Sequence, residues 1–266
     1  MIVITGRDNQ KLKFARGVRD GREAGFIFLE GARLAAEARR SRAEIVETLV
    51  SESFLAKNEG SPLLEGAVPV ADRIFDSITE TKSPQGIVII AKRPVTSIEA
   101  IDASIAQTPG LPVVIFLNEA NNPSNLGAIL RTAEAAGVRG VVTSRNSADV
   151  FSPKALRAAM GASLRLPVCE NAGFDETLAW AKGKGLTVAA ADIAGKKNYT
   201  ETDWEKPRLL IFGSEAHGLS DSEKEKIDEL IRIPMENEVE SLNLAVSCGI
   251  ILFEAKRQTE QALRNE

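Results

Sequence analysis

The stretch that decides the fold is Val113-Val-Ile-Phe-Leu-Asn-Glu-Ala-Asn-Asn-Pro-Ser-Asn-Leu-Gly-Ala-Ile-Leu-Arg-Thr-Ala133. Its apolar run Val113–Leu117 predicts a buried strand, and the apolar spacing that follows predicts a helix over Asn125–Ala136. Between them, Asn122 or Ser124 can cap the helix, and Pro123 suits its opening turn. A strand that leads directly into a helix is the repeating unit of a parallel α/β sheet.

The same alternation continues along the chain. Further strands are predicted at 140–143, 166–168, 187–191, 209–212 and 231–234, and further helices at 153–161, 174–182, 222–229 and 241–257. This order predicts a parallel sheet covered on both faces, with ligands beyond the carboxyl ends of its strands.

A smaller part precedes this pattern. Strand-like runs at 26–29 and 86–91 flank two segments of helix or strand character, 31–40 and 43–50. Residues 92–112 contain three prolines around a weakly helical patch, which is typical of a domain boundary. We therefore expect a small α/β domain at 1–95, a linker at 96–112 and a second domain at 113–266.

Composition limits the function classes. The 266 residues are 44% hydrophobic and 26% charged, with a net charge of −4, which argues against a protein that simply coats nucleic acid. Residues 1–95 nevertheless carry 15 basic and 13 acidic residues. A basic N-terminal stretch could bind RNA locally, or it could be a solvated helix face. The residues of that stretch are Arg7, Lys11, Lys13, Arg16, Arg19 and Arg22.

Cysteine and histidine are scarce. Cys169, Cys248 and His217 are the only ones, which leaves no Cys/His zinc site and makes a disulfide framework unexpected. The start of the chain does not resemble a secretory signal, and the apolar stretch Leu244–Phe253 is too short to span a bilayer. We expect no metal, no membrane association and a cytoplasmic setting.

Three polar segments follow predicted strands, and the first is 117–133. Gly127 and Arg131 stand four residues apart, so a helix presents them on one face. An interior glycine costs a helix about 1 kcal/mol relative to alanine, which suggests a close approach there with Arg131 beside it. The alternative is a solvated arginine on a surface helix.

The second segment is Leu209-Leu-Ile-Phe-Gly-Ser-Glu-Ala-His-Gly-Leu-Ser220. Gly213 to Gly218 nearly copies the pattern GxxxxGK[ST], but Leu219 replaces the lysine, which disfavours nucleoside triphosphate binding. What remains is a glycine-rich loop with free backbone N–H groups and one acid, Glu215, which suits an adenine-ribose ligand; a plain turn is the alternative. His217 lacks an acidic partner at motif spacing and is interpreted as structural.

The third segment is Ile231-Arg-Ile-Pro-Met-Glu-Asn-Glu-Val-Glu-Ser-Leu-Asn-Leu-Ala-Val-Ser-Cys-Gly-Ile-Ile-Leu-Phe253. A strand is expected to end at Pro234, and Ser241 is expected to cap a long helix after an acidic loop. An apolar stripe on that helix is typical of a core or partner-helix contact. It comprises Leu242, Val246, Gly249 and Phe253.

Together, the three segments resemble the signature motifs of the SpoU (TrmH-like) RNA ribose methyltransferases of the SPOUT superfamily, over about residues 111–258. Through Asn9…Lys13, Phe28-Leu-Glu-Gly31 and Ser83-Pro-Gln-Gly86, the N-terminal part is similar to the small substrate-binding domain that often precedes this catalytic domain. The resemblance implies a parallel sheet with a deep trefoil knot, S-adenosylmethionine held bent in the knot's loops, and a homodimer with the active site near the subunit interface.

The resemblance also assigns site residues. One position departs from the family's IPMxGxVxSLN pattern: Asn237 stands near the usual glycine, and we expect the loop to persist because asparagine tolerates left-handed backbone. The implied catalytic residues are Asn125, Arg131, Glu215, Ser241 and Asn243. The implied cofactor contacts, largely through main chain, are Gly213, Ile233, Met235 and Leu242.

The implied reaction transfers a methyl group from S-adenosylmethionine to a ribose 2′-hydroxyl of a structured RNA, with ribosomal RNA favoured over tRNA. Arginine stays protonated in proteins, so we interpret Arg131 as binding the adjacent phosphate or stabilising the developing alkoxide. Two alternatives are a non-catalytic RNA-binding protein that keeps the fold and a P-loop enzyme. Leu219 argues against the second.

Overall fold

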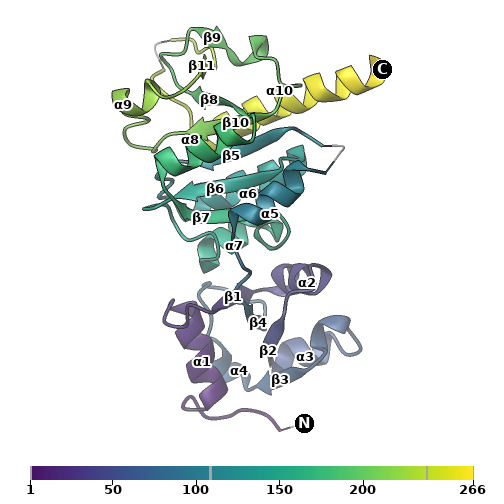
Figure 1. Ribbon diagram of the computed structural model, residues 1–266. Coiled ribbons are helices and arrows are strands. Elements are labelled where there is room, and N and C mark those ends of the chain that lie inside the picture. The colour runs from purple at the N-terminus through teal and green to yellow at the C-terminus, as the bar shows by residue number, and fades with distance from the viewer. Residues whose placement is uncertain (1, 108–109, 238, 266) are drawn as a thin grey trace. The chain divides into compact units, whose positions relative to one another are not determined.

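The computed structural model describes residues 2–107, 110–237 and 239–265. The chain divides into two compact units, whose elements Figure 1 labels. The first comprises Met1–Val95 and Asp149–Arg165, and the second comprises Thr96–Ala148 and Leu166–Glu266. Each unit is built around its own sheet.

The first unit contains a mixed sheet that is four-stranded over the described residues, in the order β1-β4-β2-β3. β2 and β3 pair parallel, whereas β4 pairs antiparallel with β1 and β2. The strands are β1 (Phe26–Glu30), β2 (Ile45–Ser51), β3 (Ala67–Val70) and β4 (Ile87–Lys92). The described α-helices before residue 96 are α1 (Gln10–Arg19), α2 (Ala32–Arg40), α3 (Glu52–Lys57) and α4 (Asp72–Phe75), and a short 3-10 helix spans Pro62–Leu64.

Apolar side chains from α1, α4 and the sheet form the core of this unit. Leu12, Phe28, Leu49 and Phe75 are each almost completely buried in one cluster. The predicted strands at 26–29 and 86–91 are present as β1 and β4, and the two ambiguous segments between them are helix α2 and strand β2.

The segment Asp149–Arg165 follows β6 in the sequence but belongs to the first unit. It contains α7 (Pro153–Ala159) and a short 3-10 helix (Ala162–Leu164). Arg157 Nη1 lies 2.6 Å from Oε2 of Glu80, and Arg165 forms an ion pair with Glu37. The sequence placed this segment in a domain spanning 113–266. These contacts with residues far away in the sequence are the reason for the difference.

The second unit contains a parallel sheet in the order β7-β6-β5-β10-β8-β11-β9, all of its described pairs being parallel. The predicted α/β class with a parallel sheet is therefore confirmed. The strands are β5 (Val113–Leu117), β6 (Gly140–Ser144), β7 (Val168–Ala172), β8 (Thr187–Ala191), β9 (Lys197–Asn198), β10 (Arg208–Phe212) and β11 (Glu229–Arg232).

Helices cover this sheet. α5 (Ile98–Ile105) and α8 (Phe174–Gly183) supply Ile101, Leu178 and Ala181 to a cluster on one face, where Phe116 and Ile211 are also buried. α6 (Pro123–Ala136) and α10 (Leu244–Asn265) pack against each other and contribute nothing to that cluster. Alternate strand residues such as Ile115 and Leu117 are fully buried as well, as expected for a sheet covered on both faces.

Helix α5 lies within the stretch 96–112 that the sequence predicted to be a linker. Thr108 and Pro109 of that stretch lie outside the described residues. Ile101 is fully buried, and a Cβ on Gly140 would lie only 2.8 Å from its Cγ1. The missing side chain of Gly140 thus makes room for Ile101, and this packing anchors α5 in the second unit.

Two predicted helices differ most from the observed bounds. The helix expected at 222–229 is only α9 (Asp221–Lys224), because Asp228 and Ile231 bind to β8 and the chain enters β11. The long C-terminal helix starts at Leu244 rather than Ser241.

Two strands that come late in the chain, β10 and β11, lie between strands that come earlier. β10 lies between β5 and β8, and β11 lies between β8 and β9. Each late strand is therefore inserted between two strands that precede it in the chain. The trefoil knot implied by the family resemblance stays a prediction.

No helix in the described ranges combines the length and apolarity needed to cross a membrane.

Candidate active site

Three loops meet the same edge of the second unit's sheet. They follow β5, β10 and β11, which are parallel and lie within four adjacent positions of the strand order. Because parallel strands present their carboxyl ends at one edge, the three polar segments singled out in the sequence are brought to that edge.

A serine side chain of β6, Ser144, holds the loop after β5 in place. Glu119 adopts a left-handed backbone with φ of 56°, and its N–H donates to Ser144 Oγ at 2.7 Å. Asn122 then caps α6 by accepting from the N–H of Ser124 at 2.9 Å, with Pro123 in the first turn, as predicted. The start of α6 is thereby held in one position.

The loop after β10 is closed by its own backbone. Ser214 and Gly218 exchange two backbone hydrogen bonds, of 3.1 and 2.9 Å, which leave the residues between them exposed. A Cβ on Gly213 would lie 2.4 Å from the carbonyl carbon of Gly218. Glycine is therefore required at 213 by the loop itself. Leu219, which replaces the P-loop lysine, is buried in the core.

The loop after β11 leads into α10. Asn237 adopts φ of 57°, so asparagine does take the left-handed conformation expected at this position. Asn243 caps the helix, because its Oδ1 accepts from the N–H groups of Ala245 at 2.9 Å and Val246 at 3.3 Å. The prediction that Ser241 caps the helix is wrong: Asn243 is the residue directly before the first helical position, and Ser241 is exposed.

A chain of side-chain hydrogen bonds joins the three loops. Asn125 donates from Nδ2 to Oε1 of Glu215 at 2.6 Å, and Asn243 donates from Nδ2 to Oδ1 of Asn125 at 3.2 Å. Asn125 is half-buried, and its two partners are exposed. The structure thus brings together three of the five predicted catalytic residues, each from a different segment.

Arg131 lies further along α6, about 9 Å from Asn125 by the rise of a helix. Its side chain is exposed and forms no hydrogen bond or ion pair with any residue that the structure describes. Gly127, four residues earlier in the same helix, is buried, whereas Arg131 is exposed. The guanidinium group is left available to a ligand.

The predicted cofactor contacts lie on the chain between β11 and α10. Ile233 and Met235 are half-buried, and Leu242 is 37% exposed. Together they leave apolar surface beside polar loops.

Other chemistries find little support here. The described residues contain no group of histidine, cysteine and acidic side chains that could hold a metal ion. Burial raises the pKa of both thiols, Cys169 and Cys248, so neither is a ready nucleophile. His217 is exposed at the tip of the loop after β10.

The sequence missed one polar residue at this edge. Asn118 directly follows β5, is 8% exposed, and donates from Nδ2 to Oε1 of Glu223 at 2.9 Å. Its position directly after a fully apolar run is the signal that could have identified it.

The basic stretch of the first unit is largely engaged within that unit. Lys11 pairs with Glu47, and Arg19 donates to the carbonyl oxygens of Ser77 and Thr79 at 3.2 and 3.1 Å. Several of these cations therefore support α1 rather than forming a free basic face.

Comparison with known proteins agrees with this arrangement. Residues 112–253 match the SpoU rRNA Methylase family. Over 144 residues the chain is 38% identical to an uncharacterised tRNA/rRNA methyltransferase of Synechocystis, covering 54% of this chain and 53% of that protein. Over 154 residues it is 34% identical to the 23S rRNA (guanosine-2′-O-)-methyltransferase RlmB of Coxiella burnetii, covering 58% and 61%. The chain thus spans between about half and three fifths of these two relatives.

A solved structure matches over nearly the whole length. The AdoMet-bound rRNA methyltransferase from Sinorhizobium meliloti superimposes with a TM-score of 0.81 at 27% identity, covering 96% of this chain and 97% of that one. The family match covers more than half of the chain and includes all three loops. The chain therefore belongs to the SpoU rRNA methylase family.

Proposed function

We propose that this protein transfers the methyl group of S-adenosylmethionine to a ribose 2′-hydroxyl of ribosomal RNA. The observation that carries the proposal is the hydrogen-bonded series Glu215–Asn125–Asn243, which connects the three family segments at the carboxyl edge of a parallel sheet. That edge is where such sheets hold their ligands.

The residues at the edge fit S-adenosylmethionine. Ile233, Met235 and Leu242 offer apolar surface for an adenine ring, and the exposed loop after Gly213 offers main-chain groups and Glu215. Ligand sites typically combine such apolar walls with a few polar groups. When bound, the cofactor supplies an electrophilic methyl group on a positively charged sulfur.

Arg131 is assigned to the RNA. A guanidinium binds two oxygens at once and stays protonated, so it suits the phosphate beside the reacting ribose or the alkoxide that develops at O2′. Its exposure and lack of a described partner support this role. Ser241 and Asn243, which flank Leu242, would complete the surface that orients the ribose, and orientation contributes much of the rate in a two-substrate transfer.

The choice of ribosomal RNA rests on the relatives. One relative is a 23S rRNA (guanosine-2′-O-)-methyltransferase, and a solved structure that shares the fold over 96% of this chain is an rRNA methyltransferase. Recognition of a ribose hydroxyl restricts the substrate to RNA. We assign RNA binding to the unit that contains Met1–Val95, and the reaction to the cytoplasm.

We also propose a homodimer built on α10. Val246 and Phe253 are seven residues apart on one side of the helix and are 51% and 50% exposed. The opposite side carries buried Cys248, Ile251 and Leu252 and serves the core. An exposed apolar stripe of this kind favours a self-complementary interface.

The test is a pair of measurements on the full chain. Calorimetric titration should show binding of S-adenosylmethionine and none of ATP, and labelled methyl groups should appear in ribosomal RNA. Binding of ATP alone would support the P-loop alternative. RNA binding without binding of S-adenosylmethionine would support a non-catalytic protein. Either result would contradict the proposal.

A further inference from the structure

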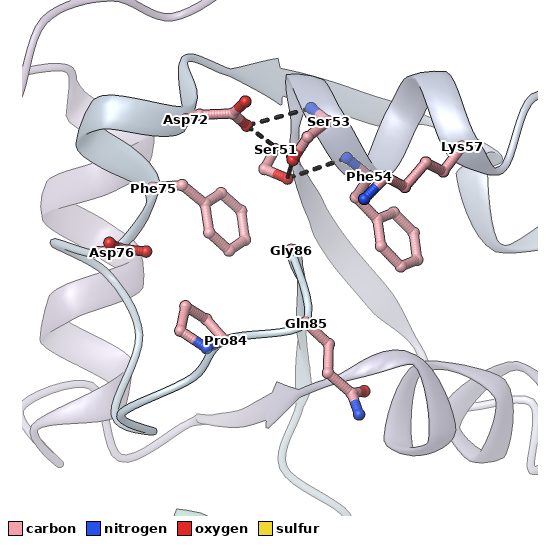
Figure 2. Close-up of a pocket in the computed structure, with 10 residues that line it drawn as sticks. All are labelled: Ser51, Ser53, Phe54, Lys57, Asp72, Phe75, Asp76, Pro84, Gln85 and Gly86. Carbon is pink, nitrogen blue, oxygen red and sulfur yellow. Dashed lines mark hydrogen bonds between the residues drawn. The ribbon is translucent and has the colours of Figure 1, made fainter.

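The first unit contains a cavity of about 370 Å³ where β2 ends and β4 begins. Figure 2 shows the residues that line it, which come from α3, α4 and the loop before β4. A volume above 300 Å³ is in the range of small-molecule sites and accommodates a nucleobase with room for water.

The lining of the cavity includes a glycine, Gly86, at which a side chain does not fit. Gly86 has φ of 85°, and a Cβ there would lie 2.6 Å from Ser51 Oγ and 2.7 Å from Phe54 Cβ. A side chain at this position would therefore clash with Ser51 and displace Phe54. Figure 2 shows the rings of Phe54 and Phe75 on either side of Gly86, the second ring being 2% exposed.

The rim carries two carboxylates, those of Asp72 and Asp76, and one cation, Lys57. Asp72 Oδ1 accepts from the N–H and the hydroxyl of Ser53, both at 3.1 Å, and is thereby fixed. The carboxylate of Asp76 is exposed and has no hydrogen-bond or ion-pair partner among the residues that the structure describes. A carboxylate accepts hydrogen bonds and donates none, so the rim is suited to a ligand edge rich in N–H groups.

A second cavity of about 290 Å³ adjoins the first. Gln85 lines both, and Arg33 and Arg157 line the second. Arg157 pairs with Glu80, whereas Arg33 is exposed and forms no ion pair within the described ranges. An acidic, aromatic cavity thus lies next to one that carries basic side chains.

We propose that the first cavity binds a single unpaired guanine that is extruded from the RNA, with Arg33 contacting a neighbouring phosphate. This inference rests on the proposed function, since it specifies the RNA that the first unit recognises. Proteins read single-stranded RNA by stacking unpaired bases on aromatic rings and by bonding their Watson–Crick edges. Here Phe54 is the stacking ring, and Asp76 accepts from the guanine edge.

Charge determines which part of the nucleotide enters. The two carboxylates outweigh the single ammonium group of Lys57 and disfavour a phosphate, so the base enters the first cavity and the backbone stays near the arginines. Guanine presents two adjacent N–H donors to one carboxylate. Uracil presents a single N–H donor between two carbonyl oxygens. These carbonyl oxygens would be repelled by the oxygens of the carboxylate.

The experiment measures dissociation constants of the full chain for short RNA stems. One stem is fully paired, and the others carry a single bulged guanosine or uridine. The variants are Asp76→Asn and Phe54→Leu. Glu59→Gln is the matched control, because Glu59 is exposed in the same unit and lies outside both cavities.

The bulged guanosine should bind at least about fivefold more tightly than the paired stem or the bulged uridine, the lower end expected for one stacked base. Asp76→Asn should abolish the preference over uridine, and Phe54→Leu should weaken both bulged stems, while Glu59→Gln changes neither. Equal affinity for all three stems, or no effect of either variant, would overturn the inference.

Failure of the proposed function is separate. It would show as absent binding of S-adenosylmethionine by the wild-type chain, whatever the RNA preference. If that binding is intact and the stems bind equally, only the guanine site is wrong.

Discussion

Asn125 donates a hydrogen bond of 2.6 Å to Glu215, a residue 90 positions later in the chain. The same amide accepts from Asn243 at 3.2 Å. One side chain at the start of α6 therefore connects the loop after β10 with the start of α10. Because both partners are exposed, these hydrogen bonds contribute little to the free energy of unfolding. We infer that they hold the three loops in fixed positions relative to one another.

Asn125 and Glu215 should therefore be energetically coupled in the reaction. Asn125→Ala and Glu215→Ala should each slow methyl transfer, while the double variant loses less than the sum of the two. The coupling expected for residues in direct contact is about 0.5–3 kcal/mol. Urea unfolding should change by no more than about 0.5 kcal/mol, as for surface substitutions. Strictly additive effects on the rate would show that the contact is incidental.

Asn243 has two separable roles. Asn243→Asp keeps an oxygen that caps α10 but loses the Nδ2 donor to Asn125, so stability should stay near wild type while methyl transfer falls. Asn243→Ala should lose both, at a cost of about 1 kcal/mol for the missing cap. Unfolding and transfer rates of the two variants give the comparison. If Asn243→Asp is fully active, the donor is not needed.

Gly213 is constrained by the protein itself. A Cβ would meet the backbone of Gly218 and Leu219 at 2.4 to 2.7 Å, so Gly213→Ala should distort the loop and lower the melting temperature as well as the affinity for S-adenosylmethionine. Gly218→Asn is the control, because Gly218 has φ of 64° and open space around its Cβ position. It should fold normally, since asparagine tolerates this backbone. Normal stability of Gly213→Ala would contradict the clash.

The proposed dimer depends on the exposed stripe of α10. Sedimentation should show a dimer at micromolar concentration, and Val246→Glu with Phe253→Glu should convert it to a monomer, because a charge buried without a partner is costly. Ile193→Glu is the control, since Ile193 is 58% exposed in the same unit and is not part of α10. A monomeric wild-type chain would refute the proposal.

The sequence predicted β5, β6, β8 and β10 well because these strands are continuous apolar runs. It placed β7 at 166–168 and β11 at 231–234 and missed β9, because these three strands contain polar residues. Val113–Leu117 was predicted with its observed bounds, and the Asn122 cap followed from local chemistry. Contacts between residues far apart in the chain could not be predicted from the sequence in this way. Ile101 fits beneath Gly140, and Arg165 reaches Glu37, and neither contact leaves a local signal in the sequence.

The candidate site shows the same division. The family resemblance pointed to Asn125, Glu215 and Asn243 as individual residues, but nothing in the spacing showed that they bond to one another. The cap was assigned to Ser241 because serine is a good capping residue. Asn243 occupies that position because its side chain serves the helix and Asn125 together. Roles of this kind depend on three-dimensional contacts.

Arg131 is the residue that we assign to the methyl-transfer step itself. If it stabilises the phosphate or the developing alkoxide, Arg131→Ala should bind S-adenosylmethionine normally but lose at least about 100-fold in rate, the scale of removing one preorganised donor. Arg131→Lys keeps the charge without the planar fork and should recover only part of the rate. Single-turnover conditions with enzyme in excess separate slow chemistry from weak RNA binding.

The most direct measurement locates the transferred methyl group. Ribosomal RNA labelled by the wild-type chain under these conditions is hydrolysed with alkali, which cleaves beside every free 2′-hydroxyl but not beside a methylated one. We predict that the label is recovered in alkali-resistant dinucleotides, and that Arg131→Ala yields almost none in the same time. Label in alkali-sensitive mononucleotides, or a near wild-type rate for Arg131→Ala, would contradict the account.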